Sequence, residues 1–268
     1  MPPEEHYKPR PAPARRPTDR RKLAVAVAVP ALIVAALIAV FVTRNDEPAV
    51  TGEDPLIQYC STAIERDTIQ LPDTTQANPS EELKDSVPVT AARLVLLTER
   101  MLEAAPENVQ PELKSQIAAY RGLVRSREPS GFADPKLLAS LNETGTANAE
   151  ICSMQKVEFA ASQFRYRDFP SELNSGRTSF VMNNEAKERH QMVLFRRKPE
   201  FEGSFTDLLG RGKQDEEATR GAAGEAEPGK TIVISVELPG GRYAVTCFVR
   251  SGTEEHWRKG EIAEFTVR

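Results

Sequence analysis

One uncharged apolar run, residues 23–43 (LAVAVAVPALIVAALIAVFVT), constrains this chain more than any other feature. As a helix it would be about 30 Å long, which matches the hydrocarbon core of a bilayer. Pro30 removes one backbone donor, which membrane helices tolerate better than soluble ones. A cleaved signal peptide is the alternative, but residues 44–55 (RNDEPAVTGEDP) offer no convincing small-x-small cleavage site. We therefore expect a retained transmembrane helix over residues 23–43.

The charges that flank this run predict its orientation. Basic residues precede it at Arg15, Arg16, Arg20, Arg21 and Lys22, whereas only Arg44 follows closely, beside Asp46 and Glu47. By the positive-inside rule the N-terminus is cytoplasmic and the C-terminal part is extracytoplasmic. Residues 1–22 are basic and rich in proline, which favours a disordered tail. We expect a single-pass protein of the plasma membrane that contacts the lipid bilayer through residues 23–43, with residues 44–54 as a linker.

The overall charge excludes one class of partner. The chain carries a formal net charge of −4, and its basic residues before the apolar run form only a short tail. It therefore lacks the positive field that binding to nucleic acid requires. The sequence also contains no HExxH, GxSxG or phosphate-binding glycine loop. We expect neither nucleic-acid binding nor enzymatic activity.

Residues 55–155 have the spacing of helices. The positions Val109, Leu113, Ile117, Tyr120 and Val124 recur every three or four residues, which places them on one buried helical face. Another helix is expected over about residues 89–105. Asp–Pro pairs at 54–55 and 134–135 are start signals for two more, because aspartate caps a helix and proline suits its first turn. The pattern predicts a small bundle of four or five helices.

Two cysteines, Cys60 and Cys152, lie near the two ends of this predicted bundle. An extracytoplasmic location is oxidising enough to keep a bridge between them. We predict a disulfide, which would constrain the unfolded chain by about 4 to 5 kcal/mol in the loop-entropy model. A redox-active pair is the alternative, but it would be expected at the close CxxC spacing that these cysteines lack.

The spacing of apolar residues changes near Val157, and in residues 157–268 apolar and polar positions alternate as they do in β-strands. One buried face is predicted for Ile232, Ile234, Val236 and Leu238, and another for Tyr243, Val245, Cys247 and Val249. Residues 239–241 (PGG) predict a hairpin between these two strands. A second hairpin is expected to join residues 177–183 to 190–196, and residues 262–267 form a closing strand. These short strands suit a β-sandwich, whereas residues 213–230, charged and rich in alanine and glycine, predict a mobile insertion.

Two of the three histidines, His190 and His256, lie with Cys247 in this strand-rich segment. Two imidazoles and a thiolate are the donor set of a mononuclear copper site. The third histidine, His6, lies in the tail that is predicted to be on the other side of the membrane. The alternative is that Cys247 packs as a small apolar residue and that both histidines are only hydrogen-bonded.

The same residues resemble a known family, the cupredoxins, which include plastocyanin and azurin. The segment VMNNEAKERHQMVLF (181–195) resembles their strand, turn and first-ligand histidine. The segment GRYAVTCFVRSGTEEHWRKGEIAEFTV (241–267) resembles their last two strands, with a tyrosine four residues before the cysteine and a histidine beyond it. The resemblance covers about residues 157–268. It implies that His190, Cys247 and His256 are equatorial copper ligands and that Glu261 replaces the usual axial methionine.

Two features depart from the family pattern. Residues 248–255 make a longer loop between Cys247 and His256 than the simplest cupredoxins have, which would preorganise the ligands less. The carboxylate of Glu261 is a hard, charged ligand, which favours Cu(II) over the softer Cu(I) state. The departures favour copper binding over reversible electron transfer.

The sequence therefore predicts an α+β multidomain protein. It comprises one transmembrane helix, a disulfide-closed helical bundle over residues 55–155 and a cupredoxin-like β-sandwich over residues 157–268. The favoured function is a non-catalytic interaction module that binds another protein of the cell envelope. The alternative is a copper-binding protein, for copper handling or electron transfer, that uses His190, Cys247, His256 and Glu261.

Overall fold

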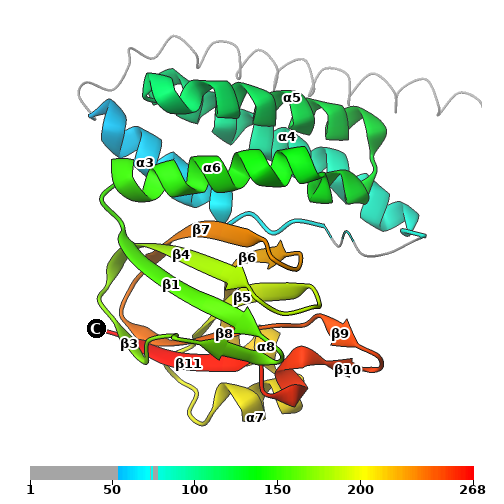
Figure 1. Ribbon diagram of the computed structural model, residues 1–268, viewed down its shortest axis with the longest axis vertical. Helices are drawn as coiled ribbons and strands as arrows, with labels where there is room; N and C mark the ends of the chain where they lie inside the picture. The colour runs from blue at the N-terminus through cyan, green and yellow to red at the C-terminus, as the bar shows by residue number, and fades with distance from the viewer. Residues whose placement is uncertain (1–53, 73, 75–77) are drawn as a thin grey trace, which may run out of the picture. The chain divides into compact units, whose positions relative to one another are not determined.

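A computed structural model describes residues 54–72, 74 and 78–268. The predicted tail and transmembrane helix, residues 1–43, and all but the last residue of the linker lie outside the described residues. Among the residues described, no helix is both long enough and apolar enough to cross a bilayer. The described part of the chain forms one compact unit, in which a layer of helices lies against one side of a two-sheet β-sandwich (Figure 1).

The helical layer contains four α-helices, as the spacing predicted for this part of the chain. They are α3 (Pro55–Asp67), α4 (Glu81–Ala104), α5 (Gln110–Ser126) and α6 (Pro135–Ile151), with 3-10 turns at Glu107–Val109 and Pro129–Ala133. Asp54 and Asp134 cap α3 and α6 by accepting backbone N–H bonds, with proline in the first turn. Helix α4 begins before the expected position because Ser80 caps it and Pro88 is accommodated inside it.

The disulfide between Cys60 and Cys152 is confirmed. The two Cα atoms are 5.6 Å apart, and both residues are buried. The bridge joins α3 to the residue that follows α6, and Tyr59, Met101 and Leu113 belong to the apolar core around it. It closes a loop across 92 positions of sequence, which in the entropy model corresponds to about 4 to 5 kcal/mol.

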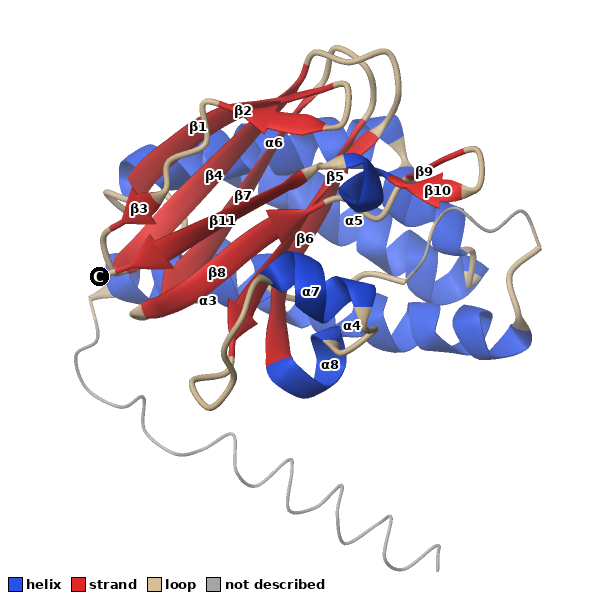
Figure 2. Cartoon of the chain, turned by 90° about the horizontal axis from the view of Figure 1, so that it is seen from below, coloured by secondary structure: helices blue, strands red, loops and turns tan. Residues whose placement is uncertain are grey.

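The β-sandwich consists of two mixed sheets (Figure 2). The first has the order β2-β1-β4-β7 and contains β1 (Gln155–Ser162), β2 (Arg165–Arg167), β4 (Gly176–Asn184) and β7 (Thr231–Leu238). The second has the order β3-β11-β8-β5-β6 and contains β3 (Glu172–Leu173), β5 (His190–Arg197), β6 (Ala218–Ala226), β8 (Gly241–Thr246) and β11 (Ile262–Val267). Apolar residues of both sheets, such as Phe180, Met192 and Val245, fill the space between them.

Both predicted hairpins are wrong. Strand β4 pairs with β1 and β7, whereas the following strand β5 pairs with β6 and β8 in the other sheet. Strands β7 and β8 are likewise divided between the two sheets. In each case the turn reverses the chain, as its residues predict, but carries it across the sandwich. Each strand has a buried face toward the same core, so alternation alone does not reveal which sheet it joins.

The predicted mobile insertion at residues 213–230 is also wrong. It forms a short helix, α8 (Gln214–Glu217), and the edge strand β6, which pairs with β5. The small residues of β6 allow β7 to pack closely against it. A Cβ added at Gly224 would lie 2.8 Å from Ile234 Cδ1 of β7. Ala222 and Ala226 are buried in the same way. The outer face of this sheet is covered by α7 (Phe205–Gly210) and Trp257.

Polar side chains attach the helices to β7, the edge strand of the first sheet. Asn142 of α6 donates to Thr231 O at 2.6 Å and accepts from Val233 N at 3.1 Å. Asp67 at the end of α3 accepts from Ser235 N at 3.0 Å. These side chains occupy backbone groups that would otherwise form an open sheet edge. The helical layer is thus fixed to the sandwich by hydrogen bonds as well as by packing.

A buried polar network lies behind this contact, and we name it the Arg66 network. Arg66 is 3% exposed; its guanidinium donates to Asp67 Oδ1 at 2.9 and 2.7 Å and to Gln116 Oε1 at 2.9 Å. Gln116 Nε2 in turn donates to Ser140 and, at 2.8 Å, to Thr144 Oγ1. The buried side-chain nitrogen and oxygen atoms of Arg66, Asp67 and Gln116 all have partners, and the two charges neutralise each other.

Candidate metal centre

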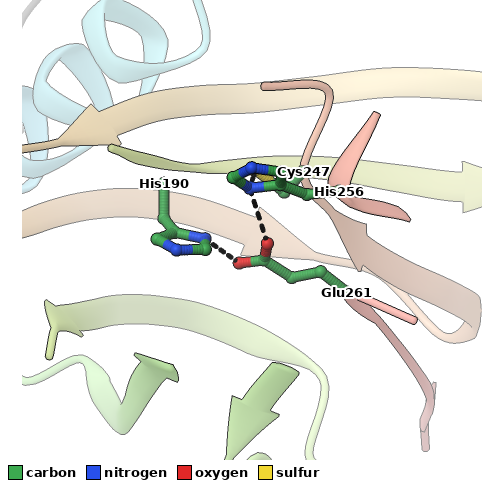
Figure 3. Close-up of side chains that lie close together, drawn as sticks. All are labelled: His190, Cys247, His256 and Glu261. Atoms are coloured by element: carbon green, nitrogen blue, oxygen red, sulfur yellow. Dashed lines mark hydrogen bonds and ion pairs between the residues drawn. The ribbon is translucent and has the colours of Figure 1, made fainter. Parts of the chain in front are cut away.

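Three neighbouring strands of the second sheet bring four predicted site residues to one end of the sandwich. His190 is the first residue of β5, and Cys247 directly follows β8. His256 begins the 3-10 turn His256–Lys259, and Glu261 directly precedes β11. Because β5, β8 and β11 are antiparallel neighbours, the start of one lies beside the end of the next. Figure 3 shows the four side chains meeting at this point.

The ligand-type atoms of these residues lie close together. His190 Nδ1 is 2.6 Å from Glu261 Oε1, and His256 Nδ1 is 3.1 Å from Glu261 Oε2. Cys247 Sγ is 3.5 Å from His256 Nδ1. One ligand atom from each of the four residues can be chosen so that all lie within 4.8 Å of one another. Ligand atoms that bind one metal ion through bonds of about 2.0–2.3 Å lie at distances from one another similar to those in this cluster.

The cluster is removed from solvent. His190 is 1% exposed, and Cys247, His256 and Glu261 are 0% exposed. Within the described residues, no lysine or arginine forms an ion pair with Glu261; its only ion-pair partners are the two histidines. Glu261 Oε2 lacks a hydrogen bond of normal geometry. A buried carboxylate whose ion-pair partners are imidazoles has no permanent counter-charge, and a cation at this position would supply one.

The surroundings also set the protonation of the sulfur and the imidazole. Burial, and then the nearby Glu261 carboxylate, raise the pKa of the Cys247 thiol well above its usual value. The thiol is therefore protonated until a cation offsets these effects, since a metal ion favours the thiolate. Burial lowers the pKa of His256, which keeps this imidazole in the neutral form that a metal requires.

The loop between Cys247 and His256 is more ordered than its length suggested. It contains a two-stranded hairpin, β9 (Arg250–Ser251) with β10 (Glu254–Glu255). Backbone bonds close its base: His256 N donates to Val249 O at 2.8 Å and Trp257 N donates to Cys247 O at 3.0 Å. The expectation that this longer loop preorganises the ligands less stays a prediction. Pairing within the loop does restrict its conformations.

Groups that the sequence did not reveal surround the cluster. Gln191 N donates to Cys247 Sγ at 3.2 Å, and Glu188 Oε2 lies 3.2 Å from His256 Nε2. The ring of Phe164 meets the His256 ring edge-on, with centroids 4.9 Å apart. A backbone N–H carries no sequence signal, and Glu188 lies in a charged loop where nothing distinguishes it from its neighbours. Only the fold identifies these contacts.

The donor set fits a single metal ion. Two neutral imidazoles, a sulfur and a carboxylate can fill four coordination positions, and a second-sphere hydrogen bond to His256 is already present. The buried carboxylate of Glu261, with one oxygen lacking a hydrogen bond, is the observation that most favours a bound cation. The role of His190, Cys247, His256 and Glu261 as metal ligands stays a prediction.

No family model and no curated protein matches this chain significantly. Solved structures do match its C-terminal part. Dithionite-reduced auracyanin from Roseiflexus castenholzii has 16% identity and a TM-score of 0.31, over 42% of this chain and 97% of its own. Auracyanin A, a blue copper protein from Chloroflexus aurantiacus, has 12% identity and a TM-score of 0.28, over 42% and 98%.

Reduced rusticyanin is similar in the same way, with 13% identity and a TM-score of 0.28 over 42% of this chain and 80% of its own. These proteins are cupredoxins, the group that residues 157–268 resemble in sequence. The C-terminal part of the chain thus matches solved cupredoxin structures, at TM-scores of 0.28 to 0.31. At these identities the similarity describes the fold alone.

Proposed function

We propose that the β-sandwich binds one copper ion through His190, Cys247 and His256, with Glu261 as the fourth ligand. The observation that carries the proposal is the convergence of four donors, distant in sequence, within 4.8 Å of one another in a buried site. The sequence alone favoured a metal-free interaction module. The buried carboxylate of Glu261, which has no lysine or arginine partner among the described residues, favours the copper-binding alternative, because a bound cation would supply a permanent counter-charge.

The ligand set indicates how copper would be held. The Cys247 thiolate and the two imidazoles suit copper in either oxidation state, whereas a carboxylate is a hard ligand that favours the divalent ion. When bound, copper would supply one-electron redox chemistry at this position. The chain's own contribution is to exclude water and to hold the four donors in place. These properties support stable binding of Cu(II), and hence copper handling, over rapid electron transfer.

We also propose that this site lies outside the cytoplasm. The apolar run at residues 23–43 and the basic residues before it are the basis for a single membrane span with the C-terminal part outside. The disulfide between Cys60 and Cys152 agrees with an oxidising compartment. We further propose that the protein is not an enzyme and that its partner is another envelope protein that delivers or accepts copper.

Titration of the full-length chain with Cu(II), in detergent, tests the proposal. We expect one equivalent of copper to bind and to give the strong visible absorption of a thiolate-to-copper transition. Cys247→Ser should abolish this absorption, and His190→Ala and His256→Ala should weaken binding. The matched control is His6→Ala, which removes the third histidine and should leave the spectrum unchanged.

The titration also has an outcome that overturns the proposal. If stoichiometric Cu(II) produces no absorption, and equilibrium dialysis detects no bound metal, the copper function is wrong. The metal-free interaction module would then be the better account of the domain. Binding that survives Cys247→Ser together with His256→Ala would place copper elsewhere and would equally contradict the assignment.

A further inference from the structure

A carboxylate contacts the outer edge of His256, on the side away from the copper ligands. Glu188 Oε2 is 3.2 Å from His256 Nε2, whereas His256 Nδ1 lies 3.5 Å from Cys247 Sγ and 3.1 Å from Glu261 Oε2. The two ring nitrogens therefore have separate surroundings. Nε2 meets a single acceptor at the surface, and Nδ1 is turned toward the buried cluster.

Glu188 is held in this position although its side chain is half exposed. Its other carboxylate oxygen accepts from Ser251 Oγ at 3.2 Å, which ties it to the β9–β10 hairpin. Its backbone oxygen accepts from Asn184 Nδ2 at 2.8 Å, and Asn184 is 2% exposed. Glu188 is also only two positions before His190. One short segment thus carries one proposed ligand and the group that contacts another.

The position of the single proton on a neutral imidazole decides which nitrogen can bind a metal. A neutral histidine has one N–H donor and one nitrogen with a free lone pair, and a hydrogen bond to one nitrogen selects the tautomer. Glu188, when ionised, can only accept, so the contact at 3.2 Å favours a proton on Nε2. The lack of a hydrogen bond of normal geometry at Glu261 Oε2 agrees with an unprotonated Nδ1.

We propose that Glu188 is a positioning residue that fixes the Nε2–H tautomer of His256 and so aims the Nδ1 lone pair at the metal position. This inference rests on the copper site proposed above. Phe164 and the ring of His190, whose centroid is 4.7 Å away, restrict the plane of the ring without accepting a proton. Glu261 Oε2, 3.1 Å from Nδ1, would favour a proton on Nδ1 instead, so Glu188 is the contact that favours the Nε2–H tautomer. Hydrogen bonds of this kind commonly change metal affinity by about 10–100-fold when removed.

The test compares three variants of the full-length chain, Glu188→Ala, Glu188→Gln and Glu254→Ala. Glu254 lies on β10, is exposed and also carries a negative charge, so its variant controls for the loss of charge near the site. Two quantities are measured. The first is the tautomer of His256 in metal-free protein, from two-bond ¹H–¹⁵N correlations in ¹⁵N-labelled samples. The second is the Cu(II) dissociation constant, together with the visible absorption of the copper-loaded protein.

We expect Glu188→Ala to lose the dominance of the Nε2–H tautomer and to bind Cu(II) about 10–100-fold more weakly. Glu188→Gln keeps an acceptor oxygen, so it should retain the tautomer and most of the affinity. Glu254→Ala should match the wild-type protein in both measurements. An unchanged tautomer in Glu188→Ala overturns the inference, as does an equal loss of affinity in Glu188→Ala and Glu254→Ala.

The two measurements separate this inference from the proposed function. If the wild-type protein binds no copper, the proposed function fails, and the tautomer of the metal-free protein still decides whether Glu188 orients His256. If copper binds and the tautomer does not respond to Glu188, only the inference fails. Because Glu188 is half exposed, none of the three substitutions leaves an unfilled space in the core.

Discussion

Two buried polar clusters in this molecule differ in how completely they are satisfied. The Arg66 network pairs a guanidinium with a carboxylate, and the buried side-chain donors and acceptors of Arg66, Asp67 and Gln116 have partners. The cluster of His190, Cys247, His256 and Glu261 is as deeply buried, yet Glu261 has no lysine or arginine partner among the described residues. The first cluster is complete within the protein, whereas the second contains no lysine or arginine among the described residues.

The difference indicates what each cluster does. A satisfied network makes its contacts on folding and then has nothing left to bind, so it serves to fix α3, α5 and α6 against one another and against β7. A cluster with an unbalanced carboxylate is tolerated where a ligand completes it, since uncompensated buried charge is costly.

The largest effect is expected from breaking the Arg66 network. Arg66→Met keeps most of the side-chain volume but leaves Asp67 and Gln116 without their main partner. We expect the free energy of unfolding to fall by about 3 to 5 kcal/mol, because one charge of a buried pair is then uncompensated. Urea denaturation measures this loss. Arg125→Met, an exposed position on α5, is the control and should change stability by less than about 0.5 kcal/mol.

A loss below about 1 kcal/mol for Arg66→Met would remove the contrast between the clusters. It would mean that the network relaxes or admits water when its cation is absent. Copper binding should be unaffected by the substitution in protein that remains folded, because the network contacts the edge of the first sheet at β7 and the site lies beside strands of the second.

Matched removal of one negative charge from each cluster sharpens the contrast. Asp67→Asn deprives Arg66 of its counter-charge and should lower the free energy of unfolding by about 3 kcal/mol. Glu261→Gln in metal-free protein should change it by less than about 1 kcal/mol, because relief of the unbalanced charge offsets a lost hydrogen bond. Chemical denaturation of both variants, without copper, gives the comparison. Equal losses in the two variants would show that Glu261 is already compensated.

The smallest effect concerns pH. Burial lowers the pKa of His256 in the folded protein, while an unfolded histidine titrates near about 6.5. The unfolded chain then binds more protons in the window below about 6.5, so stability is full above that pH and falls as the pH decreases toward the folded-state pKa. One proton limits the slope to about 1.4 kcal/mol per pH unit. Denaturation of metal-free protein at several pH values measures it.

His256→Gln should flatten this slope, and His6→Gln should leave it unchanged. A slope of the opposite sign in the wild-type protein would mean that the folded state takes up protons in this range. That result would contradict a neutral His256 and would weaken the resemblance of the cluster to a metal site.

The parts of the fold that the sequence predicted are those set by local chemistry. Helical spacing identified the four helices, and the Asp–Pro pairs marked the starts of α3 and α6. Donor type alone selected His190, Cys247 and His256, and the fold brings them together with Glu261. The pairing of Cys60 with Cys152 followed from compartment and position. Each of these conclusions uses residues that are specialised for one role.

The failures concern choices that depend on distant parts of the chain. Turn residues such as Gly240 show where the chain reverses, but both sheets share one core, so they do not show which sheet follows. Strand β6 was missed because Ala222 and Gly224 look like linker residues, and their small size matters only against Ile232 and Ile234 of β7. The Arg66 network was missed because it joins three helices and a strand. Nothing in the sequence distinguishes its residues from other polar residues; only the fold brings them together.

The Cys60–Cys152 bridge has a mechanical consequence. It links the first half of α3 to Cys152, between α6 and β1, so tension applied to the two ends of the chain passes through the sulfur atoms. Helices α4, α5 and α6 lie outside that load path and cannot be stretched while the bridge is intact. Reduction would place them in series with the sandwich. In single-molecule pulling, treatment with a thiol reductant should therefore increase the contour length released on unfolding. The increase should equal the length of chain between Cys60 and Cys152, which the intact bridge keeps from extending.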